Sequence, residues 1–220
     1  MKLIDRLKIT IPFSYMWLLR RSLGNSKTIL DLGCGDGFLM EVLTEGMSCK
    51  VVGVDLYEKN VKSASKKDIF IQVFKMDVIK FIRQQIRKGR KYDLVFCSQV
   101  IEHIERDKGE RLLSLLDKVA KQRIIIGTPR EFMEQHPSYL EGNPHQAHKS
   151  GWSEEDFWKR GYKVSGIGFS PFWSESGSIR VSSNKSVDSF FFVVSFLLSP
   201  IVYFIPKIAA GILCIKDIKK

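Results

Sequence analysis

A glycine-rich stretch at residues 27–38, KTILDLGCGDGF, constrains the fold more than any other part of the sequence. It begins with a short apolar run at 28–32 that includes an acid, Asp31, and continues with glycines that alternate with Cys34 and Asp36. The residues that follow, FLMEVL, have helical spacing. A strand, a glycine turn and a helix in this order allow a nucleoside cofactor to lie against bare backbone, because glycine adopts positive φ and has no side chain. An ordinary turn between a strand and a helix is the alternative.

Further apolar runs of strand length alternate with helical patterns along the chain. Because strands alternate with helices, we expect a parallel, doubly wound α/β sheet with right-handed crossovers. The next four runs lie at 50–54, 69–77, 92–97 and 123–129, a sixth strand follows a capped helix that starts at Ser153 and Asp156, and the best candidate for a seventh strand is 211–218.

Polar residues stand where three of these strands end. Asp55 follows the second strand, about 20 residues beyond the glycines, where a carboxylate can accept hydrogen bonds from ribose hydroxyls. Asp77 ends the third strand, and residues 98–103 follow the fourth. All of them should face one crevice, because ligands of open α/β sheets bind beyond the carboxyl ends of the strands. A helix N-cap is the alternative role for Asp55 and Asp77.

This series of motifs, over about residues 25–170, resembles the class I S-adenosylmethionine (SAM) dependent methyltransferases. The run Glu102-His103-Ile104 is similar to that of small-molecule and quinone-biosynthesis methyltransferases, and it departs from the Asn/Asp-Pro-Pro-Tyr pattern of enzymes that methylate nitrogen in nucleobases or glutamine. The resemblance implies a Rossmann-like sheet of seven strands, mostly parallel with an antiparallel last strand. It also implies methyl transfer from SAM to oxygen or carbon, with release of S-adenosylhomocysteine.

The resemblance assigns each part of SAM to a part of the sequence. Asp31 and the glycine turn hold the amino-acid part, Asp55 binds the ribose hydroxyls, and Asp77 lies beside the adenine amino group. Ser98 and Gln99 line the methionine end. The full set of implied cofactor contacts is Asp31, Gly33, Cys34, Gly35, Asp36, Gly37, Asp55, Leu56, Asp77, Val78, Ser98 and Gln99.

His103 and Glu102 are the candidate catalytic residues. An imidazole pKa lies near working pH, so His103 could remove a proton from an acceptor hydroxyl or carbon acid as the methyl group arrives. A structural hydrogen bond that shapes the active-site turn is a comparable role for His103, and Glu102 carries the same two alternatives. SAM brings its own sulfonium leaving group, so the transfer needs in-line positioning and one base at most.

The segment 130–152 has little periodicity and carries three of the four histidines. It leaves the carboxyl end of the fifth strand, so it can close over the acceptor, and long loops of this kind are usually functional. We expect substrate contacts there, with packing or solvent exposure as the alternative. We expect no metal, because the His145-x-x-His148 spacing lacks a cysteine or a second close ligand pair. The residues expected to contact substrate are His145, His148, Lys149 and Trp152.

Two segments flank or interrupt the methyltransferase-like domain, which we place at 27–220. Residues 1–26 form an amphipathic helical leader, broken at Pro12, that either caps the sheet and the cofactor pocket or lies on a membrane surface. An apolar insertion at about 171–210 separates the sixth and seventh strands and contains the aromatic run 189–206. That run allows three interpretations: a helical hairpin packed on the sheet or a dimer partner, a monotopic membrane anchor, or a transmembrane span, for which it is short.

Charge and cysteine usage bear on partners and location. Lys and Arg number 35 and Asp and Glu 24, which gives the 220-residue chain a net charge of +11 and suits nucleic acid, anionic lipid or an acidic substrate. The sequence shows no RNA-binding module, so we expect a small-molecule or lipid-linked acceptor instead of nucleic acid. The four cysteines lack CxxC spacing and no cleavable signal peptide is apparent, which favours a cytoplasmic protein, with or without peripheral contact to the inner face of the membrane. A non-catalytic SAM-binding or membrane scaffold protein, an RNA methyltransferase and a homodimer stay open.

Overall fold

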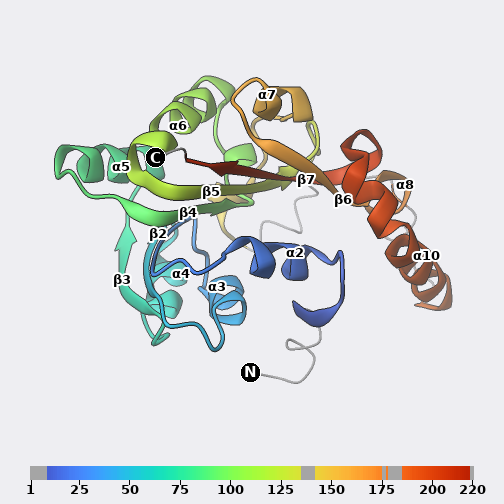
Figure 1. The fold of residues 1–220 in the computed structure, drawn as a ribbon, viewed down its shortest axis with the longest axis horizontal. Coiled ribbons are helices and arrows are strands. Elements are labelled where there is room, and N and C mark those ends of the chain that lie inside the picture. Colours follow the sequence, from blue (N-terminus) through green and yellow to red (C-terminus); the bar gives the residue numbers. More distant parts are fainter. Residues whose placement is uncertain (1–8, 135–141, 175–176, 178–184, 219–220) are drawn as a thin grey trace.

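Seven strands pair into one sheet in the part of the chain that the structure, a computed structural model, describes: residues 9–134, 142–174, 177 and 185–218. The order across the sheet is β3-β2-β1-β4-β5-β7-β6 (Figure 1). The strands are β1 (Thr28–Leu32), β2 (Lys50–Asp55), β3 (Phe70–Lys75), β4 (Tyr92–Ser98), β5 (Ala120–Pro129), β6 (Lys163–Phe169) and β7 (Ala209–Asp217).

Helices connect these strands and cover the sheet. The α-helices are α2 (Tyr15–Ser22), α3 (Phe38–Leu43), α4 (Glu58–Ala64), α5 (Val78–Arg87), α6 (Arg106–Val119), α7 (Glu154–Trp158), α8 (Ser170–Trp173) and α10 (Lys185–Phe204). Short 3₁₀ turns are η1 (Ile101–His103), η3 (Pro144–Gln146) and η4 (Pro206–Ile208).

The strand directions confirm the expected mixed sheet. Strands β1 to β5 run parallel, and β7 runs antiparallel to both of its neighbours, β5 and β6. The sequence order of the strands reverses at β1, which pairs with β2 on one side and β4 on the other. In open α/β sheets a ligand crevice forms beyond the carboxyl ends of the strands at such a reversal. The glycine turn follows β1, so it lies where such a crevice is expected.

Two apolar layers hold the helices on the sheet, one on each face. Alternate residues of β1 show the division: Leu30 and Leu32 pack with α5, α6 and α7, whereas Ile29 packs with α2, α3 and α4. Figure 1 shows the same arrangement, with these two groups of helices on opposite faces. A parallel sheet that is covered on both faces needs apolar residues on both, which explains the nearly continuous apolar runs in its strands.

Two local predictions meet different outcomes. The expected capping box is present at the start of α7, where the Ser153 N–H donates to Asp156 Oδ2 at 2.8 Å. The helix expected at 106–121 ends earlier, at Val119, because Ala120 already pairs with Tyr92 of β4. Strand β5 therefore begins at Ala120 and not at the expected residue 123.

The leader contributes a helix over the sheet. Ser14 caps α2 by accepting a hydrogen bond from the Trp17 N–H, and Leu18 and Leu19 are buried against the sheet. Helix α2 therefore covers the sheet, as one of the two interpretations of the leader expected. The helical pattern expected at residues 3–7 lies outside the described residues.

The regular elements in the described part of the insertion between β6 and β7 are α8, the 20-residue α10 and the 3₁₀ turn η4. Helix α10 packs on β6 so closely that a Cβ on Gly166 would overlap the Val202 carbonyl oxygen. One side of α10 thus lies on the sheet, as the packing interpretation expected, and its other side faces solvent. Among the described residues, no helix has both the length and the apolar character needed to cross a bilayer.

Candidate active site

The glycine turn leaves β1 with three left-handed residues. Gly33, Gly35 and Gly37 have φ values of 71°, 57° and 80°, which side chains disfavour. A Cβ added to Gly35 would meet no atom within 4 Å, so the backbone there faces open space. The Cys34 thiol is buried and points to the Gly35 carbonyl, while Asp36 is exposed. At Gly35 the turn therefore leaves bare backbone open to a ligand, and binding of SAM there stays a prediction.

Two buried carboxylates lie beside this turn. Asp55, at the end of β2, accepts hydrogen bonds from the Gly35 N–H at 2.9 Å and from the Tyr57 N–H at 2.8 Å. Burial, and secondarily the Asp55 charge, raises the pKa of Asp31 to about 8. A buried carboxylate with a raised pKa is ready to accept a cation, because a positive charge would offset its desolvation. Leu56, which follows Asp55, is exposed at the rim.

Asp77 has the alternative role that was left open for it. Its Oδ1 accepts the Lys80 N–H at 2.9 Å and caps α5. Val78, the first residue of α5, is buried. Asp77 still lies beyond β3, at the same sheet edge as Asp55, so contact with adenine stays a prediction.

The end of β4 is tied to the leader by a residue that the sequence did not point to. The Tyr15 hydroxyl, on α2, lies 2.6 Å from Ser98 Oγ, and a Cβ on Gly127 would overlap that hydroxyl. Burial raises the pKa of Tyr15 to about 12, so the phenol stays protonated. Gln99 follows with φ of 55°, and its N–H donates to the Gly127 carbonyl at 2.7 Å. Ser98 and Gln99 thus form a strained turn over β5.

Glu102 is buried behind this turn. Its Oε2 accepts the Thr128 hydroxyl at 3.1 Å, while its Oε1 has no hydrogen-bond partner among the described residues. Burial raises the pKa of Glu102 to about 8. The backbone carbonyl of Glu102 accepts the N–H groups of Lys149 and Ser150, at 2.7 and 3.1 Å, and so holds the end of the 130–152 loop.

His103 and His148 come together across that loop. Their ring centroids are 5.0 Å apart. His103 Nδ1 lies 3.2 Å from the Ala147 carbonyl oxygen, and His148 Nδ1 is hydrogen-bonded to the Met133 carbonyl. Burial lowers the pKa of His103 to about 4, so this ring is neutral at neutral pH.

Glu102, His103 and His148 form a cluster of ligand atoms that could hold a metal ion, which we call the histidine cluster. One donor atom each from Glu102, His103 and His148 lie within 4.8 Å of one another. Glu102 Oε1 has no hydrogen-bond partner in the described part of the chain, so it is available as the ligand oxygen. A mixed set of imidazole and carboxylate ligands suits first-row divalent ions. The metal site weighed from the sequence was the pair His145 and His148. The structure instead places His148 beside Glu102 and His103, which follow β4.

The other residues expected to contact substrate have different positions. His145 and Lys149 are exposed on the loop. Trp152 is fully buried in the apolar layer of α6 and α7, stacked under the Arg106 guanidinium at 3.9 Å. The expected acceptor contact of Trp152 is therefore corrected: its ring fills the core above Gly109, where a Cβ would overlap it.

A large cavity opens beside the cluster. Its volume is about 880 Å³, and it extends from the ends of β4 and β5 to α10. Thr128 and Met133, which are hydrogen-bonded to Glu102 and His148, line it together with Phe192 and Phe196 of α10. Glu102, His103 and His148 themselves are not among the described residues that line it. Because most of its lining is apolar, the cavity suits an apolar molecule.

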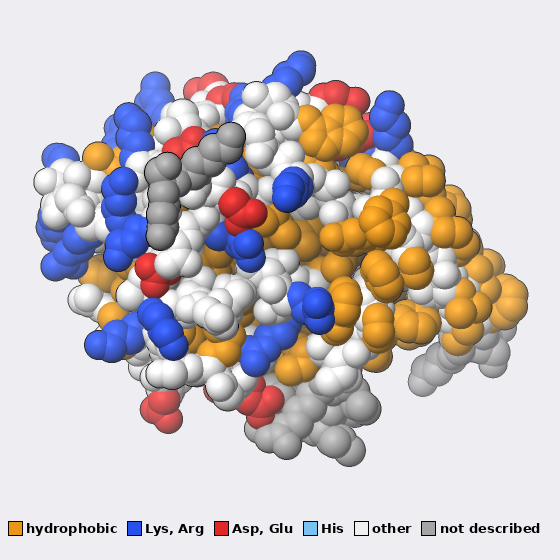
Figure 2. Space-filling model, viewed as in Figure 1, with side chains coloured by type: hydrophobic (Ala, Val, Ile, Leu, Met, Phe, Trp, Pro, Cys, Tyr) orange, Lys and Arg blue, Asp and Glu red, His pale blue; other side chains and the backbone are white. Residues whose placement is uncertain are grey.

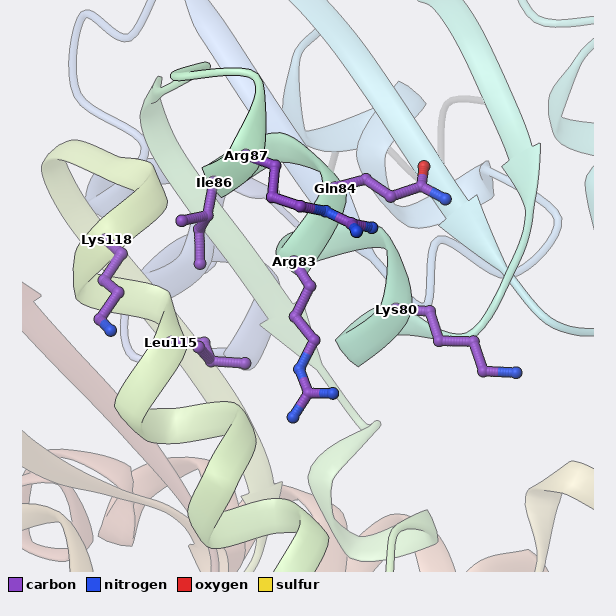
Figure 3. A pocket seen from close by; sticks show the side chains of 7 residues that line it. All are labelled: Lys80, Arg83, Gln84, Ile86, Arg87, Leu115 and Lys118. Carbon is purple, nitrogen blue, oxygen red and sulfur yellow. The ribbon is translucent and has the colours of Figure 1, made fainter.

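A second hollow lies away from this site, between α5 and α6. Figure 3 shows its basic side chains, and its volume is about 540 Å³. The lining residues are Lys80, Arg83, Gln84, Ile86, Arg87, Leu115 and Lys118. The expected site residues do not line it, so part of the excess positive charge lies apart from the crevice.

Comparison with known proteins finds a protein-family model that matches part of this chain. Residues 29–123 match a family model described as "Methyltransferase domain". A ubiquinone biosynthesis O-methyltransferase of Rickettsia bellii is 30% identical over 99 residues, which cover 44% of this chain and 40% of that protein. A magnesium-protoporphyrin O-methyltransferase of Synechocystis is 26% identical over 117 residues, 53% of this chain and 50% of that protein. The chain thus spans half or less of the length of these curated relatives.

Solved structures share the fold over nearly the whole chain. A SAM-dependent methyltransferase from Archaeoglobus fulgidus has a TM-score of 0.57 at 19% identity and covers 98% of this chain and 100% of its own. The N-methyltransferase NodS from Bradyrhizobium japonicum has a TM-score of 0.55 at 11% identity, and the match covers 99% of this chain and 100% of NodS. At such identities the similarity shows the fold.

Proposed function

This chain belongs, through residues 29–123, to the class I SAM-dependent methyltransferases, and we propose that it transfers the methyl group of SAM to an apolar or lipid-linked small molecule. The reaction is methylation of oxygen or carbon, and S-adenosylhomocysteine is released. The observation that carries the acceptor class is the apolar cavity of about 880 Å³ that begins at the ends of β4 and β5. The reaction class rests on the family and on the crevice beside that cavity.

Asp31, the glycine turn and Asp55 hold SAM in this proposal. The methionine ammonium lies near Asp31, since a buried carboxyl with a pKa of about 8 gains most from a neighbouring cation. Asp55 exchanges some of its hydrogen bonds to backbone for hydrogen bonds from the ribose hydroxyls. SAM supplies an electrophilic methyl group, so the chain itself must position the acceptor in line and accept at most one proton.

His103 is the better placed of the two candidate bases. Its Nδ1 faces the Ala147 carbonyl and carries the ring proton there, which leaves Nε2 with a lone pair. The imidazole is neutral at neutral pH because its pKa is lowered to about 4. Glu102, with a pKa raised to about 8, is mostly protonated at pH 7 and accepts no proton in that form. In this proposal Glu102 therefore supports the turn, and His103 receives the acceptor proton. Burial overturns the expectation of an imidazole pKa near working pH, because a pKa of about 4 makes the free ring a weak base.

Oxygen is the favoured acceptor atom, and a reducing compartment the favoured location. The curated relatives above are named as O-methyltransferases, which supports oxygen as the acceptor atom.

The cysteines support a cytoplasmic location, because all four are free thiols: Cys34, Cys49, Cys97 and Cys214. A soluble metabolite remains the competing acceptor, and the apolar cavity argues against a strongly polar one.

Calorimetry with SAM, followed by methyl transfer from tritiated SAM, tests the proposal. The full chain should bind SAM, and Asp55→Ala should abolish that binding, while the exposed-acid control Asp107→Ala keeps it. With a lipid extract as acceptor source, radioactivity should enter the organic phase for the full chain and for the control only. Unchanged SAM affinity in Asp55→Ala would remove the ribose assignment. SAM binding without transfer to lipid or soluble fractions would instead support a non-catalytic SAM-binding protein.

A further inference from the structure

Helix α10 carries an apolar stripe on the side that faces away from the sheet. Phe190, Leu197 and Phe204 are spaced seven residues apart, which is about two helical turns, so they lie in one line along the helix. Val193 and Ile201 fall between them at helical spacing, and all five side chains are exposed. We call these five residues the outer stripe. Figure 2 shows hydrophobic side chains gathered at the end of the molecule where α10 lies.

The opposite side of α10 is used for packing. Ser195 and Val202, also seven residues apart, are buried, and Ser195 Oγ accepts the Trp173 indole N–H at 2.7 Å. The helix is therefore fixed in rotation, and its outer stripe is held away from the protein core. Large apolar side chains exposed in a continuous patch usually mark an interaction surface.

The apolar patch is continuous with the large cavity. Phe192, Val193 and Phe196 line the cavity and are at the same time exposed, and so is Ile11 of the leader. An apolar molecule could thus pass from the outer surface of α10 into the cavity without crossing water. A protein partner on this patch would cover the mouth of the cavity, whereas a fluid lipid surface would leave it accessible.

The rim of the patch has the composition of a membrane interface. Phe13 of the leader contacts both Trp17 and Tyr203, with ring centroids 5.6 Å apart in each pair, and the Arg21 guanidinium lies over Trp17 at 4.9 Å. Trp, Tyr and Arg combine an apolar body with a polar end, which suits the boundary between headgroups and acyl chains. Residues 9–23 and 189–216 contain no acid, and Lys207 is exposed just after α10.

We propose that the outer stripe docks on the surface of a phospholipid bilayer that contains anionic lipid, with α10 lying in the interface and the cavity open toward the acyl chains. The apolar stripe supplies the main attraction, and Lys207, Arg21 and the net charge of +11 supply attraction to anionic headgroups. Docking itself is independent of the proposed function. Only the consequence that a lipid-linked acceptor enters from the bilayer rests on methyl transfer.

Vesicle sedimentation of the full chain tests the docking. The probes are phosphatidylcholine vesicles and vesicles of phosphatidylcholine with phosphatidylglycerol at about 7:3. The double variant Leu197→Ser/Phe204→Ser removes the two most exposed members of the stripe, which are 68% and 75% exposed and do not line the cavity. The matched control is Ile71→Ser, 60% exposed on β3 at the other edge of the sheet. Circular dichroism and SAM calorimetry, which need no vesicles, check folding and the crevice.

The expected result is binding to both vesicles, stronger with phosphatidylglycerol, and about tenfold weaker for the double variant. The Ile71→Ser control should bind like the unchanged chain. Absence of vesicle binding, or equal binding of the double variant, overturns the proposal. Another outcome that overturns the proposal is a dimer. If light scattering shows a dimer that becomes monomeric in the double variant, and the chain does not bind vesicles, a second copy covers the outer stripe. Because SAM affinity is measured separately, failure of docking is distinguishable from failure of the proposed function.

Discussion

Replacing Asp31 by Asn tests whether this carboxyl is the counter-charge of SAM. At a pKa of about 8, roughly nine-tenths of the Asp31 side chains are protonated at pH 7. A bound methionine ammonium favours the ionised form, so SAM binding should release about 0.9 proton per site at pH 7. The SAM association constant should rise about tenfold per pH unit below pH 8 and level off above it, since ionisation is then complete before binding. In Asp31→Asn the affinity should be lower and this dependence absent.

The assay is titration calorimetry at pH 7 in phosphate and in Tris, two buffers with different heats of ionisation. Proton release makes the observed binding heat differ between the buffers, and the difference gives the number of protons. The free energy of unfolding should change with pH in the opposite direction to SAM affinity. Because the pKa of Asp31 is higher in the folded than in the unfolded chain, the contribution of Asp31 to stability is largest below about pH 4 and is lost as pH rises toward 8. Equal heats in both buffers, or a proton release that persists in Asp31→Asn, would refute the reasoning.

Two further substitutions separate chemistry from packing. His103→Ala should lower kcat by about 10²- to 10⁴-fold with the SAM Kd unchanged, as expected for a lost base, and a Kd that rises with the fall in kcat would indicate a structural role instead. Trp152→Ala should lower the free energy of unfolding by about 3–5 kcal/mol in urea, because the ring is fully buried. Trp158→Ala, which removes a ring that is 43% exposed, is its control and should cost much less; equal losses would contradict the burial argument.

The parts of the fold that follow from local pattern could be predicted from the sequence. The glycine turn, the acid at the end of β2 and the capping box of Ser153 each depend on residues close together in the chain. The apolar run at 211–218 predicts a seventh strand, and β7 lies two residues earlier at its start and one at its end, at Ala209–Asp217. The antiparallel direction of this strand came from the family resemblance, and β7 confirms both.

The parts that depend on distant contacts could not be predicted. Tyr15 reaches Ser98, 83 residues away, and no local pattern marks that hydroxyl as part of the crevice. Trp152 and His148 lie in a loop without periodicity, and contacts with distant residues hold them: Arg106 lies over the buried Trp152 ring, and His148 meets His103. Composition identified the apolar insertion but could not tell which side of α10 would be covered by β6.

The place of β7 between β5 and β6 has a consequence for how the protein unfolds and refolds. Strand β6 pairs only with β7 in the described sheet, and β7 is separated from it in sequence by residues 170–208. Closing that long segment costs chain entropy, so β6, α10 and β7 should join a preformed β1–β5 sheet late and leave it early, as one cooperative unit. The cavity lies at the junction of this unit with the rest of the chain, whereas Asp31 and Asp55 belong to the earlier part. Partial opening of the molecule would therefore widen the cavity and leave the glycine turn, Asp31 and Asp55 folded.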